Sequence, residues 1–152
     1  MPEDADAARA TVVEHFRGTP YLSRVQEVLD SALRFDDPEY LCLLSVTESP
    51  DAVNGLVLFG TVLGARLATK VHAVVAPDPR VQLALLDAVR ETCVRSGERL
   101  VVCELPADAP FDVAGVALVA SGYREEGRID DFVRDGVALR LLVWRPEAPP
   151  SR

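Results

Sequence analysis

Long hydrophobic runs are missing from this 152-residue sequence. No apolar stretch approaches the about 18 consecutive residues that a membrane-spanning helix needs. The N-terminal segment MPEDADAARA contains neither a basic leader nor an apolar core of the kind found in secretory signals. We therefore expect a soluble protein that is not exported and that has no membrane partner.

Positive charge is also scarce. The sequence contains 24 acidic and 16 basic residues, which gives a formal net charge of -8 at pH 7. Such a balance disfavours nucleic acids and anionic lipid surfaces as partners, because both would be repelled. A cationic substrate fits this charge, but moderate acidity is equally explained by solubility alone.

Cysteine and histidine are too few for a metal centre. The three cysteines, Cys42, Cys93 and Cys103, each lie in apolar sequence, and their number is odd. The two histidines, His15 and His72, lie far from the cysteines in the chain, so no spacing is typical of a zinc site. We expect no bound metal, and buried reduced thiols of the kind that suits a cytoplasmic protein.

The residues that are present indicate a globular domain. Hydrophobic residues make up 49% of the chain and charged residues 26%, and a chain of this length buries about 68% of its unfolded surface. We expect a single domain over residues 1–152, with its core between about 4 and 145 and a flexible tail, PEAPPSR, after it.

Hydrophobic periodicity predicts a mixed α/β fold. Asp78 and Pro79 mark a helix start, Gly97 marks its end, and RDG at 134–136 predicts a hairpin turn. The strand over 99–105 is apolar at successive positions, which predicts a central strand buried on both faces. The last strand is apolar enough either for the core or for pairing with a second subunit in a homodimer. The predicted helices cover 4–17, 21–35, 78–96 and 110–122, and the predicted strands cover 39–48, 55–64, 65–76, 99–105, 123–133 and 137–145, the first three as an antiparallel meander.

Three stretches carry a resemblance to a known family: AVVAP at 73–77, LLDAVRETCVRSG at 85–97 and ASGYREEGRIDDFVRDG at 120–136. They resemble the GNAT superfamily of acetyl-CoA-dependent N-acetyltransferases over about residues 4 to 145. The resemblance implies an α/β (α+β) fold with a mostly antiparallel twisted sheet and helices on both of its faces. The family's first strand has no counterpart in this sequence.

The resemblance also implies how an acyl donor would bind. In the family the pantetheine arm of coenzyme A pairs with the backbone of the strand that here holds Ala73, Val74 and Val75. The pyrophosphate is held by the amides of a glycine-rich loop, whose positions fall here on the segment of Arg80, Val81, Gln82 and Leu83. The loop is shortened and has no glycine, and the preceding residues are an acid and a proline. The guanidinium of Arg80 could replace the missing contacts, or it could simply face water.

Candidate catalytic residues are fewer than the family pattern implies. The position of the family's proton-donating tyrosine falls on Leu118. His72 is the first candidate for a general base because imidazole titrates near neutrality, and Glu104 at a strand end is the second. The aromatic residues Tyr21, Phe35 and Tyr40, and the carboxylates between Glu125 and Asp131, are candidates for the side that binds the amine.

Two further interpretations remain open. The missing glycines and the missing tyrosine are compatible with an inactive GNAT-fold module that binds or dimerises. An unrelated α/β domain would show a sheet order other than a meander followed by a parallel pair of strands. The main prediction is transfer of an acetyl group from acetyl-CoA to the amine of a small molecule or a peptide.

Overall fold

The computed structural model describes residues 2–34, 39–47, 53–62 and 64–147. The helices and strands follow one another in the order that the sequence predicts, with one added 3-10 turn, η1. They are α1 (Pro2–Phe16), α2 (Leu22–Arg34), β1 (Leu41–Val46), β2 (Val53–Thr61), β3 (Ala68–Val75), α3 (Pro79–Arg95), β4 (Leu100–Pro106), η1 (Ala109–Phe111), α4 (Asp112–Ala120), β5 (Arg124–Arg134) and β6 (Val137–Trp144).

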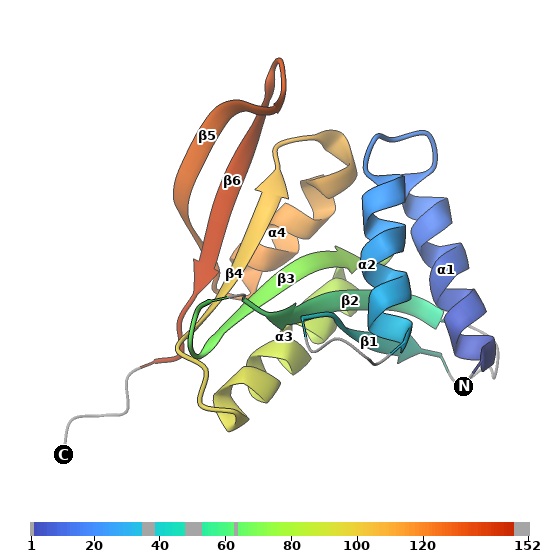
Figure 1. Ribbon diagram of the computed structural model, residues 1–152, viewed down its shortest axis with the longest axis horizontal. Coiled ribbons are helices and arrows are strands. Elements are labelled where there is room, and N and C mark those ends of the chain that lie inside the picture. Colours follow the sequence, from blue (N-terminus) through green and yellow to red (C-terminus); the bar gives the residue numbers. More distant parts are fainter. Residues whose placement is uncertain (1, 35–38, 48–52, 63, 148–152) are drawn as a thin grey trace.

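The strands form one six-stranded sheet in the order β1-β2-β3-β4-β6-β5. Only β3 and β4 are parallel, and every other neighbouring pair is antiparallel. Figure 1 shows α1 and α2 on one face of the sheet and α3 and α4 on the other. The predicted meander, the parallel pair after it and the helices on both faces are therefore confirmed. No strand precedes α1 in the described residues, which is where the sequence departs from the family pattern.

Apolar stripes explain how the helices pack. In α2 the buried residues are Val25, Val28, Leu29 and Ala32, spaced at the 3, 4, 7 intervals of a single helical face. Complete burial of a large aliphatic side chain such as Leu29 contributes about 1.5 to 3 kcal/mol. None of the helices in the described residues is both long and apolar enough to cross a membrane.

One expectation about the sheet is corrected, and the place of the last strand is now defined. In β4 burial alternates: Val101, Cys103 and Leu105 are buried, but Glu104 is exposed. The strand is central, yet only one of its faces is fully covered, because α1 and α2 pack mainly over β1, β2 and β3. The strand β6 lies between β4 and β5, so both of its edges are paired within this chain.

The cysteines are free thiols, as expected. Cys93 and Cys103 are buried, and Cys42 is half-buried. Burial raises the pKa of the Cys42 and Cys103 thiols to about 12, so both are protonated at neutral pH.

Candidate active site

The parallel strands β3 and β4 separate halfway along their length. Their pairing runs from Ala68 opposite Leu100 to Val71 opposite Cys103 and then stops. Beyond this point β3 stays paired with β2 on its other side, and β4 stays paired with β6. The next residues on the two strands are His72 and Glu104. The two catalytic candidates from the sequence therefore meet at the point where the strands part.

A bulge in the sheet places His72. On β2, Leu58 lies opposite Ala73 and its neighbour Phe59 lies opposite Val71, so His72 is the extra residue and has no partner on β2. Such a bulge locally redirects a side chain and increases the twist of the strand. The histidine ring faces the α2 side of the sheet, where it packs against Tyr40 with 5.2 Å between ring centroids.

A pocket of about 480 Å³ opens where the strands part. It lies between α2, the approach to β1, and strands β2, β3 and β4. His72, Ala73, Glu104 and the predicted acceptor-side residue Tyr40 all line it. The remaining lining residues are Arg24, Val25, Val28, Glu39, Leu58, Thr61, Val62 and Lys70.

Lys70 is a pocket residue that sequence reasoning missed. Its Nζ lies 2.8 Å from Oε2 of Glu104, across the last paired residues of β3 and β4. Lys70 precedes His72 by two positions, and this spacing on one strand was the available signal, because alternate residues share a face. The negative charge of Glu104 is thus already paired with Lys70 before any substrate binds.

The environment of His72 keeps its imidazole neutral. Burial is the main cause, with the nearby charge of Lys70 as the second, and together they lower its pKa to about 4. The ring is hydrogen-bonded to the backbone of Glu39, while Nε2 is buried without a partner among the described residues. The bond to Glu39 therefore uses Nδ1, and Nε2 carries the lone pair that can accept a proton.

Gly60 makes room for this bond. A Cβ at Gly60 would lie 1.8 Å from the backbone oxygen of Glu39, a distance that no real structure allows. Gly60 therefore lets the chain before β1 cross closely over β2, which brings the Glu39 carbonyl to His72.

The start of α3, where the resemblance places the pyrophosphate, is occupied by the chain itself. Asp78 is the N-cap: its Oδ1 accepts a hydrogen bond from the backbone N–H of Arg80 at 2.9 Å. Its backbone oxygen accepts from Val81 at 3.0 Å and from Gln82 at 3.3 Å. Pro79 has no N–H to offer. The guanidinium of Arg80 extends into solvent and binds the Asp78 carboxylate at 3.0 to 3.3 Å.

The other predicted donor-binding residues are covered to different degrees. Gln82 is fully buried, and its Nε2 donates to the backbone oxygen of Ala76 at 2.8 Å, so its side chain points into the protein. Val81 and Leu83 are half-buried. Ala73, Val74 and Val75 are buried, and beyond Val71 the β4 side of their strand faces no other strand.

No tyrosine replaces the missing proton donor at its expected place. Leu118 is fully buried in α4. Tyr123 is 2% exposed, its hydroxyl has no partner among the described residues, and burial raises its pKa above the usual range. Tyr40 is the tyrosine that lines the pocket.

Other predicted acceptor residues lie elsewhere. The hydroxyl of Tyr21 donates to Asp108 at 2.7 Å and accepts from Arg134 at 3.0 Å, which ties the start of α2 to the β5–β6 hairpin. Phe35 lies outside the described residues. Between Glu125 and Asp131, each carboxylate is already engaged within the chain: Glu125 with Arg140, Glu126 with Arg145, Asp130 with Arg128, and Asp131 with the backbone N–H of Gly136.

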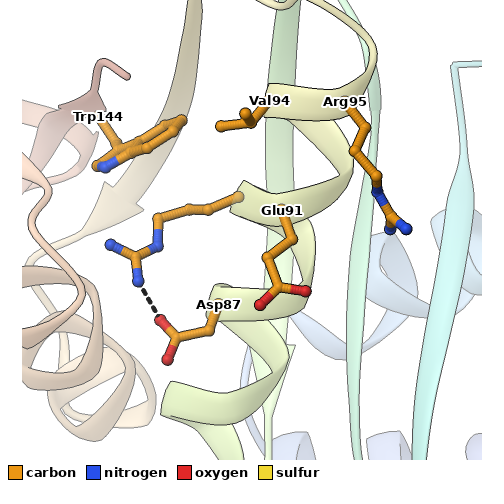
Figure 2. Close-up of a pocket in the computed structure, with 6 residues that line it drawn as sticks. Asp87, Glu91, Val94, Arg95 and Trp144 are labelled. Carbon is orange, nitrogen blue, oxygen red and sulfur yellow. Dashed lines mark hydrogen bonds and ion pairs between the residues drawn. The ribbon is translucent and has the colours of Figure 1, made fainter. Parts of the chain in front are cut away.

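A second pocket lies on the outer side of α3, away from the point where the strands part. It is lined by Asp87, Arg90, Glu91, Val94, Arg95 and Trp144, and Figure 2 shows Val94 pointing towards the Trp144 ring and Arg95 pointing away. None of the predicted site residues lines it. Arg90 donates to the backbone oxygen of Ser121 at 2.6 Å and to Asp87, and lies 5.7 Å from the centre of the Trp144 ring, so this surface joins α3 to the segment after α4 and to β6.

Similar solved structures share this architecture. A "putative acetyltransferase of the GNAT family" from Desulfovibrio desulfuricans is 19% identical, with a TM-score of 0.81 over 95% of this chain and 94% of that one. A ribosomal-protein-alanine N-acetyltransferase from Brucella melitensis is 14% identical, with a TM-score of 0.72 over 96% of each chain. An aminoglycoside 6'-N-acetyltransferase complexed with coenzyme A is 9% identical, with a TM-score of 0.73 over 99% of this chain and 95% of that one.

No family model matches the sequence, and no curated protein is similar to it in sequence. The likeness is therefore one of three-dimensional structure. The chain has the GNAT fold.

Proposed function

We propose that this protein is an N-acetyltransferase that moves an acetyl group from acetyl-CoA to the amine of a small molecule or a peptide. The observation that carries the proposal is the parting of β3 and β4 at His72 and Glu104, beside a pocket of about 480 Å³. The similar structures include enzymes for an aminoglycoside and for a ribosomal protein, which supports an amine acceptor without choosing one.

The acyl donor would enter between the strands that separate. Its pantetheine arm would pair with the backbone of Ala73, Val74 and Val75, which faces no strand on its β4 side. Its diphosphate would reach the start of α3, where Arg80 offers a guanidinium that is largely in solvent. To bind phosphate, Arg80 would have to leave Asp78.

The acceptor nitrogen would bind from the α2 side, between Glu104 and His72. Glu104 attracts the cationic form of the amine, although it shares its charge with Lys70. The cation first releases one proton to solvent; the neutral amine then attacks the thioester carbonyl carbon, a C–N bond forms and the C–S bond breaks. The nitrogen becomes strongly acidic as it bonds to carbon, so the unpartnered Nε2 of His72 would accept its proton despite the low pKa, once the bound amine displaces the groups that cover this buried atom. His72 then passes this proton to the thiolate, directly or through solvent, and free coenzyme A leaves.

Release of thiol from acetyl-CoA, measured over a panel of small amines and peptide N-termini, tests this function. We expect kcat for the best acceptor to fall by about 10²- to 10³-fold in His72→Gln and by less in Glu104→Gln, because general bases contribute rate enhancements of that order. Arg95→Gln, an exposed change on α3, is the matched control. Equal turnover in His72→Gln would remove His72 from the mechanism.

The same experiment separates the enzyme from the inactive module. Acetyl-CoA binding without thiol release for any amine would favour the module, and absence of both would contradict the proposed activity.

A further inference from the structure

The first turn of α3 offers no unused backbone N–H group to a phosphate. An anion site at a helix start needs several free backbone N–H groups that converge on one point. Here Pro79 has none, Arg80 donates to the Asp78 side chain, and Val81 and Gln82 donate to the Asp78 backbone. The side-chain amide of Gln82 is buried and bonded to Ala76. The hydrogen bonds of this turn are therefore complete without a ligand.

The charge at this place is also wrong for a diphosphate. Asp78 puts a carboxylate at the positive end of the helix dipole, where it takes the place that an anionic ligand would occupy. The hydrogen bond from the Arg80 side chain, followed by that from the Arg80 backbone, lowers the pKa of Asp78, so the carboxylate is ionised at neutral pH. A phosphate that drew Arg80 away would leave this carboxylate unpaired beside it, and repulsion would offset much of the gain.

The pantetheine side of the same cleft is open by contrast. Past Val71, β3 has no strand on its β4 side, and β4 has none on its β3 side past Cys103. An extended ligand with amide groups can pair with such an edge through backbone hydrogen bonds. Backbone groups that can bind the pantetheine arm thus remain free, whereas the backbone N–H groups that could bind the diphosphate are already used.

We infer that this protein recognises its acyl donor through the pantetheine arm and the thioester, and that the nucleotide diphosphate adds little affinity. The acyl donors are thioesters of pantetheine, with or without the nucleotide. Asp78 is the residue that keeps the nucleotide diphosphate from adding affinity. The inference rests on the proposed function, because it concerns the donor of the same acetyl transfer.

Calorimetric titration with acetyl-CoA and with S-acetylpantetheine tests the inference without knowledge of the acceptor. Where several charge-assisted hydrogen bonds hold a diphosphate, each contributes about tenfold or more, so loss of the nucleotide weakens binding by about 100-fold or more. For this protein we expect the two dissociation constants to agree within about fivefold.

Asp78→Asn sharpens the test, because asparagine caps helices as well as aspartate does, while the substitution removes the negative charge and with it the ion pair that holds Arg80. We expect this variant to bind acetyl-CoA about tenfold more tightly and S-acetylpantetheine with unchanged affinity, as removal of one repulsive charge predicts. Asp135→Asn, in the β5–β6 turn, is the matched control for net charge. Circular dichroism confirms that each variant is folded.

The outcomes are distinct. A wild-type preference of about 100-fold or more for acetyl-CoA would overturn the inference and leave the proposed function standing. Equal changes in acetyl-CoA affinity in Asp78→Asn and Asp135→Asn would overturn the role of Asp78. Binding of neither thioester would overturn the proposed function, and the inference would fall with it.

Discussion

Lys70 and Glu104 are joined across the last paired residues of β3 and β4, with 2.8 Å between Nζ and Oε2. Their side chains are 28% and 49% exposed, so solvent screens the pair and its direct contribution to stability is about 0 to 1 kcal/mol. The pair matters more for the charge that each residue presents to His72.

Substitution of Lys70 and substitution of Glu104 should shift the pKa of His72 in opposite directions. The charge of Lys70 lowers this pKa and that of Glu104 raises it. We therefore expect Lys70→Gln to raise the pKa of His72 and Glu104→Gln to lower it, with the larger shift in Lys70→Gln. NMR titration of the His72 ring measures both shifts. Arg95→Gln serves as the control for net charge, and shifts of the same sign in both variants would contradict the arrangement.

The low pKa of His72 should make the protein less stable in acid. Between pH 6.5 and about 4 the unfolded chain protonates this residue and the folded chain does not, so the free energy of unfolding falls as pH falls. At this half-buried site, after allowance for solvent screening, we expect a loss of about 1 to 2 kcal/mol between pH 7 and pH 4.5. Urea unfolding of wild type and His72→Gln at both values measures it. His72→Gln has no imidazole to protonate, so its free energy of unfolding should fall less between the two pH values. An equal fall in both proteins would show that His72 is not responsible.

Gly60→Ala should disrupt the support of His72. The added methyl group would lie 1.8 Å from the Glu39 oxygen, and the chain before β1 would have to move. We expect a loss of stability of about 1 to 3 kcal/mol, typical of forced overpacking, together with a changed chemical shift of the His72 ring. Gly127→Ala is the matched strand control, since its nearest contact is an ordinary 3.5 Å to Leu141. Equal stability of the two variants would argue against the close crossing.

Arg90→Met should loosen the helices on the α3 and α4 face. Arg90 holds the backbone oxygen of Ser121, which is buried, and lies over Trp144. Loss of these contacts should reduce the free energy of unfolding by about 1 to 3 kcal/mol. Arg95→Met removes the same charge from an exposed position on the same helix and should change stability by less than about 0.5 kcal/mol. Chemical denaturation compares the two, and a similar cost for both would show that the Arg90 contacts contribute little.

Local chemistry in the sequence determined the elements of this fold. Asp78 and Pro79 start α3, and Gly97, with φ +71°, follows its end. The apolar stripe of α2 and the Asp-Gly turn before β6 were equally readable, because helix periods, caps and turns depend on neighbouring residues. The lack of a glycine loop was also visible from the sequence.

Only the tertiary structure decided what the site residues touch. Three features of the site depend on residues that are distant in the chain. They are the bulge that places His72, the close crossing of Glu39 over Gly60, and the ion pair between Lys70 and Glu104. No periodic pattern encodes such contacts, because they depend on the register of strands that meet only in the folded sheet. The sequence by itself determined which elements form and that no glycine lies at the start of α3. The packed sheet decided that His72 is neutral, that Glu104 is shared with Lys70, and that the start of α3 is closed by its own carboxylate.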